Sequence, residues 1–126
     1  MARLSDIVID CSHPASLARF WAAALDGYAV APYDEDEIER LRSLGITDLE
    51  DDPTVLIEGP GPRLFFQRVP EPKRAKNRVH LDLAAADLDG EIVRLVSLGA
   101  SIVETFESHV WLTDPQGNEF CVMPAG

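Results

Sequence analysis

Residues 78–124 read RVHLDLAAADLDGEIVRLVSLGASIVETFESHVWLTDPQGNEFCVMP, and this stretch decides the fold. Apolar and polar residues alternate over 78–84, which predicts a strand. Asp87 is suited to cap a helix that ends at Gly99. One face of this helix is apolar, formed by Leu88, Ile92, Leu95 and Val96. Three more strands are predicted, at 101–106, 109–113 and 118–123, with an Asp-Pro-Gln-Gly turn between the last two. The order is therefore βαβββ.

The first half of the chain predicts the same order. A β-branched strand at 7–11 stops before Pro14, a residue that suits the first turn of a helix. The helix, closed by Gly27, has one apolar stripe made of Leu17, Phe20, Trp21, Ala24 and Leu25. The predicted strands that follow are 28–33, 54–58 and 63–69, the last two joined as a hairpin by Gly59-Pro60-Gly61-Pro62.

An acidic segment, residues 34–53, separates the second and third strands of the first half. Only Arg40 and Arg42 oppose its carboxylates, and Ile38 and Leu41 indicate a short helix. This composition is typical of a surface insertion that contributes little to the core. By contrast, residues 63–78 are strongly basic.

Two strand ends indicate an internal repeat. Residues 66–70 and 120–124 share a Phe, an apolar residue three positions later and a Pro. The interval from Asp6 to Gln67 exceeds that from His80 to Cys121 by the length of the acidic insertion. We therefore predict an α+β fold of two βαβββ modules with mostly antiparallel strands. Module one covers about 1–72 with the insertion 34–53, module two covers about 77–126, and together they form a single domain, 1–126.

Composition excludes several functional classes. The chain has 126 residues, 46% of them hydrophobic, which fits one globular domain. It has no apolar run long enough for a transmembrane helix or a signal peptide, so we expect a cytoplasmic protein with no membrane partner. A net charge of −11 disfavours nucleic acid as a partner. We expect the two cysteines, Cys11 and Cys121, to be reduced.

Several of these motifs together resemble the vicinal oxygen chelate superfamily, which includes glyoxalases, bleomycin-resistance proteins and extradiol dioxygenases, and more narrowly its compact glyoxalase-like branch. They are Phe20-Trp21 before Gly27-Tyr28, the strand Arg78-Val79-His80-Leu81-Asp82, Leu98-Gly99-Ala100 and Asp114-Pro115-Gln116-Gly117-Asn118-Glu119-Phe120. The resemblance covers nearly the whole chain outside 34–53. It implies that the two modules form an open cup for a small-molecule ligand and that the protein is a homodimer.

In that superfamily, metal ligands usually come from the first and last strands of each module. Carried over by position, the resemblance implies Asp6, Gln67, His80 and Cys121 as the ligand set. His80 is a standard ligand type, Gln67 is a weaker one, and Asp6 and Cys121 depart from the usual His and Glu. The implied cofactor is a divalent metal (zinc, nickel, iron or manganese), and the alternative is that no metal binds.

The residues themselves leave alternatives open. His80 shares a strand face with Asp82, so it is either a metal ligand or a histidine hydrogen-bonded to that carboxylate inside the cup. His80, Asp82 and Cys121 are all candidates for the ligand-binding site. Cys121, between Phe120 and Val122, is most simply a small buried apolar residue. Three other side chains are candidates for lining the ligand site: Gln67 through its amide, Asp10 as a carboxylate in a polar cavity, and Trp111 as a flat stacking surface.

Three functions of different kinds are compatible with the resemblance and with these residues. The first is a metal-dependent lyase or isomerase, in which the metal stabilises a developing enolate. The second is a metal-free protein that sequesters a drug-like or apolar metabolite. A regulatory domain that uses the insertion as an interaction surface is a third. Phosphate-binding loops, Ser-His-Asp motifs and Cys-x-x-Cys pairs do not occur in the chain.

Overall fold

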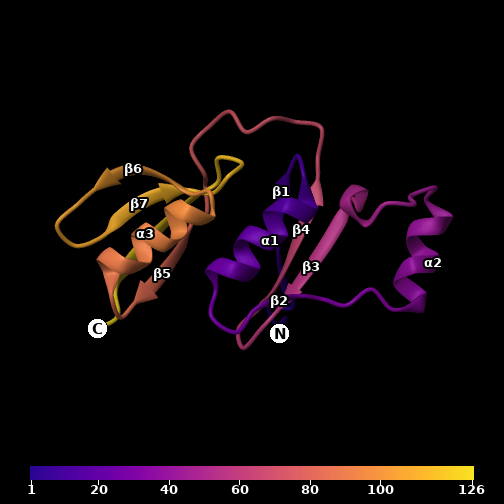
Figure 1. Cartoon of the computed structure of the whole chain (residues 1–126), viewed down its shortest axis with the longest axis horizontal. Helices are drawn as coiled ribbons and strands as arrows, with labels where there is room; N and C mark the ends of the chain where they lie inside the picture. The colour runs from indigo at the N-terminus through magenta and orange to yellow at the C-terminus, as the bar shows by residue number, and fades with distance from the viewer. The chain divides into compact units, whose positions relative to one another are not determined.

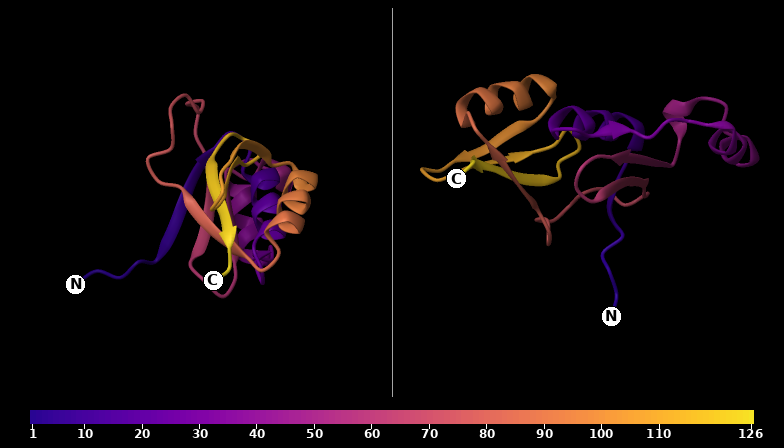
Figure 2. Two further views of the ribbon diagram at one scale, coloured as in Figure 1. Left: turned by 90° about the vertical axis from the view of Figure 1, so that its left-hand side faces the viewer. Right: turned by 90° about the horizontal axis from the view of Figure 1, so that it is seen from below.

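The computed structural model describes residues 1–126 and divides them into two compact units, 1–72 and 73–126, which are described separately here. Each unit contains one four-stranded sheet with a helix packed on one of its faces (Figures 1 and 2). Both sheets are open and mixed, with one parallel pair and two antiparallel pairs. The predicted α+β fold of two βαβββ modules is confirmed.

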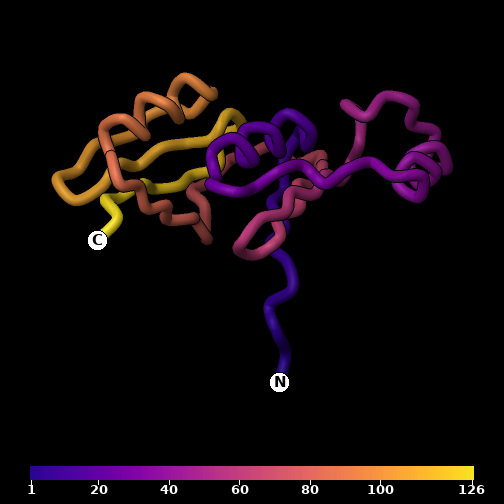
Figure 3. Tube along the Cα trace, turned by 60° about the horizontal axis from the view of Figure 1, so that its bottom comes forward, coloured from indigo at the N-terminus to yellow at the C-terminus, as the bar shows by residue number.

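The first unit begins with strand β1 (Asp6–Cys11) and helix α1 (Pro14–Ala24), and residues 1–5 extend away from its sheet (Figure 3). It continues with β2 (Ala29–Val30), α2 (Glu35–Ser43), a short 3-10 turn (Leu49–Asp51), β3 (Thr54–Glu58) and β4 (Arg63–Arg68). The strand order is β1-β4-β3-β2, with β1 parallel to β4. Because β1 and β4 are parallel, their connection must cross the sheet, and α1 makes that crossing.

Helix α1 covers one face of the first sheet. His13 caps its N-terminus by accepting a hydrogen bond from the Ser16 N–H, and Pro14 occupies the first turn as predicted. Alternate residues of β3 and β4 complete the core beneath the helix, because strand side chains point to opposite faces in turn. The fully buried core side chains include Leu17, Ala18, Trp21, Ile57 and Phe66.

The acidic insertion forms the predicted short helix, α2, which stands apart from the sheet of its unit (Figure 1). Asp34 caps it and Glu35, Asp36 and Glu37 lie in its first turn, where the helix dipole favours negative charge. The expectation that this segment contributes little to the core holds for most of it but is wrong for Leu41 and Asp52, which are 2% and 1% exposed. Asp52 accepts hydrogen bonds from Tyr33 (2.6 Å), Arg40 (3.1 Å) and the Thr54 N–H (2.9 Å).

The second unit contains β5 (Leu81–Ala85), α3 (Leu88–Leu98), β6 (Ser101–Thr105), β7 (Val110–Thr113) and β8 (Glu119–Pro124). The strand order is β5-β8-β7-β6, with β5 parallel to β8. Asp87 caps α3 and Gly99 ends it with φ +122°, as the sequence predicts. Of the four apolar residues predicted for its inner face, only Leu95 is buried, and every residue of β6 is exposed.

Two predicted strands are shorter than expected. The strand at 28–33 consists only of Ala29–Val30, because Pro32 lacks the N–H that a longer ladder would need. The strand at 78–84 begins at Leu81, so His80 precedes β5 instead of lying within it. The backbone before Leu81 is held by side-chain contacts described below.

Candidate functional site

The candidate site lies on the open face of the second sheet, opposite α3. It comprises His80, Asp82 and Cys121, whose donor atoms all lie within 4.8 Å of one another. Asp82 and Cys121 are paired across the parallel strands β5 and β8. The His80 Nε2 lies 3.2 Å from the Asp82 Oδ1, which is the carboxylate contact that the sequence suggested.

Strand alternation explains why Cys121 is accessible. Its neighbours Phe120 and Val122 are 0% exposed and point to the helix-covered face, so Cys121 points to the open face. The interpretation of Cys121 as a simple buried apolar residue is therefore wrong, since its side chain is half-buried and lies beside two polar groups. Partial burial, and then the nearby Asp82 carboxylate, raise the pKa of the Cys121 thiol. A bound cation would reverse this effect by stabilising the thiolate.

Trp111 lies on the same open face, paired with Cys121 across β7 and β8. Its ring is half-buried, and the Lys76 Nζ lies 5.1 Å from the ring centroid, a cation–π contact. Lys76 also forms an ion pair with Glu119 (2.9 Å). The surface predicted for ligand stacking is thus bordered by a lysine ammonium.

The open face of the first sheet has different chemistry. Asp6 forms an ion pair with Arg63 at 2.7 Å, and hydrogen bonds from Ser5 and then Arg63 lower the pKa of Asp6. Asp10 is paired with Gln67 at the far end of β1 and β4. Phe65 lies between these two polar ends, with the Arg63 guanidinium 5.6 Å from its ring centroid. The structure therefore brings Asp10 and Gln67 together but separates Asp6 from Gln67.

Two backbone hydrogen bonds correct the internal alignment. The Val69 N–H donates to the Cys11 carbonyl, and the Ala125 N–H donates to the Ala85 carbonyl at the equivalent place in the second unit. With these bonds superposed, Asp6 corresponds to His80 as predicted, but Cys121 corresponds to Phe65 and not to Gln67. The alignment from the sequence was shifted by two residues on the last strand. The first unit has no thiol, imidazole or carboxylate at the position of Cys121.

The donor set of the second unit fits a divalent cation. Imidazole nitrogen, carboxylate oxygen and thiolate sulfur are all zinc ligands, and three protein ligands leave a position for water or substrate. Cys121 and His80 favour zinc over magnesium or calcium, which prefer oxygen ligands. Of the four ligands implied by the resemblance, the second unit holds His80 and Cys121 together, with Asp82 beside them.

Asp82 was assigned from sequence to the ligand site but not to the metal, and Glu119 was not singled out at all. Glu119 is 8% exposed and accepts hydrogen bonds from the Asn77 N–H and from Lys76. These donors, and then the Coulombic attraction of the lysines, lower its pKa. The only sequence signal that pointed to it is a carboxylate directly before the apolar Phe120 in a chain whose two lysines, Lys73 and Lys76, both lie just before the second module.

The family follows from comparison with known proteins. A family model described as a glyoxalase-like domain matches residues 6–123, and the chain belongs to this family, within the vicinal oxygen chelate superfamily. No curated protein matches the sequence. None of the helices is both long and apolar enough to cross a membrane.

Solved structures of low sequence identity share the fold. One is a glyoxalase/bleomycin resistance protein/dioxygenase family enzyme from Burkholderia phytofirmans, with 12% identity, a TM-score of 0.71 and 98% of each chain covered. Another is the fosfomycin resistance protein FosX from Mesorhizobium loti, with 12% identity, a TM-score of 0.70, and 100% of this chain and 94% of that chain covered. The FosX protein from Listeria monocytogenes gives a TM-score of 0.69 at 11% identity, with 100% of this chain and 93% of that chain covered. At these identities the similarity concerns the fold alone.

Proposed function

We propose that this protein binds a small molecule on the open faces of its sheets, and that His80, Asp82 and Cys121 hold a divalent cation that takes part in binding it. The observation that carries the proposal is the convergence of a nitrogen, an oxygen and a sulfur donor within 4.8 Å on a face that no helix covers. The donor types make zinc the first metal to test, ahead of nickel, iron and manganese.

A cation in this place would act as a Lewis acid toward substrate oxygens, the chemistry that a lyase or isomerase needs. The residues of the chain have separate tasks around it. Asp82 orients the His80 ring through the 3.2 Å contact, as carboxylates commonly do for histidine ligands. Trp111 offers a flat apolar surface beside the cluster, and Lys76 supplies a positive charge at its edge.

In this proposal the open face of the first unit offers a recognition surface of its own, without metal chemistry. Asp10 and Gln67 are paired on an exposed face next to Phe65, so a carboxylate and an amide flank an aromatic ring. A carboxylate accepts hydrogen bonds from a cationic group, and an amide both donates and accepts. Gln67 as a metal ligand remains a prediction from the resemblance.

The second candidate function is metal-free sequestration of an apolar or cationic metabolite. One observation favours it: the first unit has Phe65 and an ion-paired Asp6 where the second unit has Cys121 and His80. The first unit therefore has no donor cluster of its own. The two functions differ in whether a stoichiometric metal accompanies the protein.

We also propose that the protein is a cytoplasmic homodimer. Both cysteines are thiols, in keeping with a reducing compartment. Support for the dimer comes from apolar side chains that α3 and β6 leave exposed, which are Val93, Val96, Ile102 and Val103. Exposed apolar patches commonly mark interfaces, and twofold packing is the commonest symmetry of oligomers. Light scattering at micromolar concentration tests this, and a monomeric mass would contradict it.

The decisive experiment combines elemental analysis with native mass spectrometry on protein purified without chelator. The metal proposal expects one divalent ion per chain, lost in His80→Gln and Cys121→Ser but kept in Asp6→Asn. Absence of metal together with a retained organic ligand would favour the sequestration function. Equal metal content in all four proteins would show that the ion binds elsewhere.

A further inference from the structure

Glu119 is a carboxylate enclosed by a segment that has no regular secondary structure. It begins β8 and is 8% exposed. Its Oε2 accepts a hydrogen bond from the Asn77 N–H at 2.6 Å, and its Oε1 accepts one from the Lys76 Nζ at 2.9 Å. The Lys73 Nζ lies 3.7 Å from Oε2. All three donors come from residues 73–80, which we call the strap.

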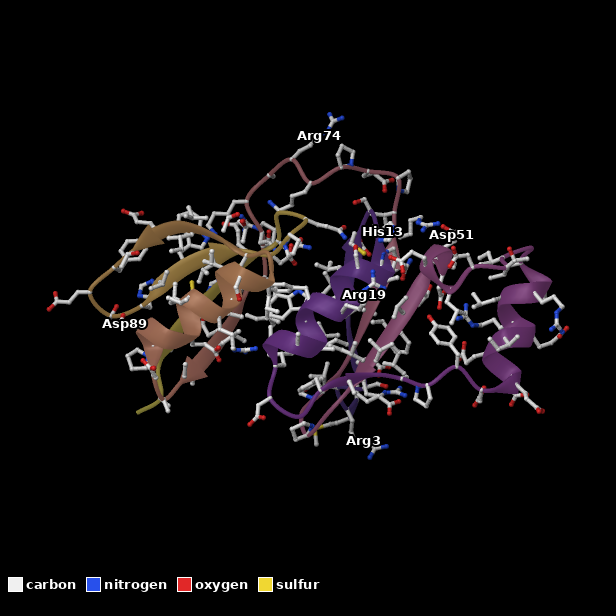
Figure 4. All side chains as sticks on the ribbon, in the orientation of Figure 1. Arg3, His13, Arg19, Asp51, Arg74 and Asp89 are labelled. Atoms are coloured by element: carbon white, nitrogen blue, oxygen red, sulfur yellow. The ribbon has the colours of Figure 1, made fainter.

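The strap leads directly into the candidate metal cluster, because its last residue is His80. Strand β5 and its ladder to β8 begin only at Leu81, so the sheet does not hold the backbone of His80. The strap is held instead by side-chain contacts. These are its hydrogen bonds and ion pairs to Glu119 and the cation–π contact of Lys76 with Trp111. Arg74, by contrast, points outward from the strap (Figure 4).

We propose that Glu119 is a positioning residue for the metal site: by anchoring the strap it keeps the His80 imidazole beside Asp82 and Cys121. The proposal rests on the proposed metal-binding function. Its physical basis is the burial of a charge, which is unfavourable unless the charge is fully hydrogen-bonded. The strap donates the hydrogen bonds that the buried Glu119 carboxylate needs, and the carboxylate in turn holds the strap in place. Disorder of the strap would lower the fraction of molecules in which His80 is placed for binding.

The equivalent position in the first unit makes the role of Glu119 specific. Arg63 stands there and forms its ion pair with Asp6, the residue that corresponds to His80. In the second unit the carboxylate instead bonds to the strap, which leaves His80 to contact Asp82. Thus Arg63 pairs with the potential ligand Asp6 in the first unit, whereas Glu119, at the equivalent position, leaves His80 available in the second.

The test uses three variants of the full-length protein and one control. Glu119→Ala removes all the strap contacts made by Glu119 but keeps that of Lys76 with Trp111. Glu119→Gln keeps an acceptor for the Asn77 N–H but loses the charge, and Lys76→Met removes only the contacts of Lys76 with Glu119 and Trp111. Glu104→Gln is the control, because Glu104 also lies on this sheet, paired with Trp111, but forms no ion pair with the strap. The measurements are Co²⁺ and Zn²⁺ affinity, amide hydrogen exchange of residues 73–80, and the NMR contacts of the His80 ring with the β-protons of Cys121.

We expect Glu119→Ala to weaken metal affinity by about 10- to 100-fold, the usual effect of losing a group that orients a ligand. Glu119→Gln and Lys76→Met should give smaller losses, with faster exchange of the Asn77 amide in Glu119→Ala and no change in the control. If Glu119→Ala fails to fold, the other two variants carry the test.

Two outcomes would overturn the inference. One is unchanged metal affinity in a folded Glu119→Ala. That result would reject the role of Glu119 but not the proposed metal site. The other is a His80 ring whose contacts with Cys121 are unaffected in the variants. If the wild-type protein binds neither Co²⁺ nor Zn²⁺, the proposed function fails, while the exchange and NMR measurements still decide whether Glu119 positions His80.

Discussion

At corresponding positions on their open faces the two units carry different residues. The first has Asp6, Val8, Leu56, Arg63 and Phe65, and the second has His80, Asp82, Trp111, Glu119 and Cys121. The covered faces, in contrast, are apolar in both. The difference shows that the apolar residues of the covered face maintain the common fold. The residues of the open face can differ between the units without changing that fold. Donors for a metal cluster together only in the second unit.

The helices differ as well. Helix α1 buries seven residues, whereas α3, at the equivalent place, buries only Leu95. Trp21 on α1 and Leu95 on α3 occupy corresponding positions beneath the two helices. The first unit therefore contains the larger share of the apolar core, and the second unit contains the candidate chemistry. The predictions below test this division.

The largest effect is expected in the core. Trp21→Ala should lower the free energy of unfolding by about 3–5 kcal/mol, because it removes a large aromatic side chain that is 2% exposed. Leu95→Ala should cost less, about 2–3 kcal/mol, since Leu95 is smaller than Trp21 and is the only buried residue of its helix. Urea unfolding followed by circular dichroism measures both. A larger loss for Leu95→Ala would contradict the assignment of the main core to the first unit.

The next effect concerns metal affinity. His80→Gln should abolish metal retention, a loss of at least about 100-fold, or about 2.7 kcal/mol, while changing the free energy of unfolding by only about 1 kcal/mol. Asp6→Asn is the matched variant in the first unit and should leave metal affinity unchanged, because Asp6 is paired with Arg63. Isothermal titration with Zn²⁺ makes the comparison. A loss in Asp6→Asn equal to that in His80→Gln would contradict the assignment of the metal to the cluster in the second unit.

The acidic insertion is joined to the rest of the first unit through the buried carboxylate of Asp52, and the second unit has no such insertion. Asp52→Ala should destabilise the protein by about 1–3 kcal/mol, because Tyr33 and the Thr54 N–H lose a buried acceptor. The neighbouring Asp51→Ala, at an exposed carboxylate in the 3-10 turn just before β3 (Figure 4), should change stability by less than about 0.5 kcal/mol. Thermal unfolding of the two variants distinguishes them. Similar melting temperatures would show that the insertion is not anchored through Asp52.

The smallest effect is a dependence of stability on pH. The pKa of Glu119 is lowered in the folded state, so the ionised carboxylate stabilises the folded protein. This stabilisation is fully present above the pKa of an unfolded Glu, about 4.3, and is lost as the pH falls through the lower pKa of the folded state. Melting temperatures between pH 3 and 7 should fall toward acid, and Glu119→Gln should flatten that fall. Asp6→Asn should flatten it less, because the pKa of Asp6 is lowered at an exposed ion pair that solvent screens. The reverse order would contradict the burial argument.

Much of the fold was predictable because its determinants are local. The helical stripe from Leu17 to Ala24, the cap at Asp87 and the turn at Gly117, where φ is +90°, are all properties of short segments. The proximity of His80 and Asp82 was predictable because the two residues are only two positions apart, although His80 directly precedes β5 instead of lying in it.

The sequence by itself determined the order of elements, the two modules and the face on which each strand residue lies, because alternation and helical periodicity follow from backbone geometry. Tertiary structure alone decided the register between β1 and β4, which placed Phe65 and not Gln67 at the position of Cys121. It also decided that Glu119 bonds to the strap 42 residues away in sequence. Register and such long-range contacts depend on which strands meet and on how buried charges are satisfied, and no local pattern in the chain records either.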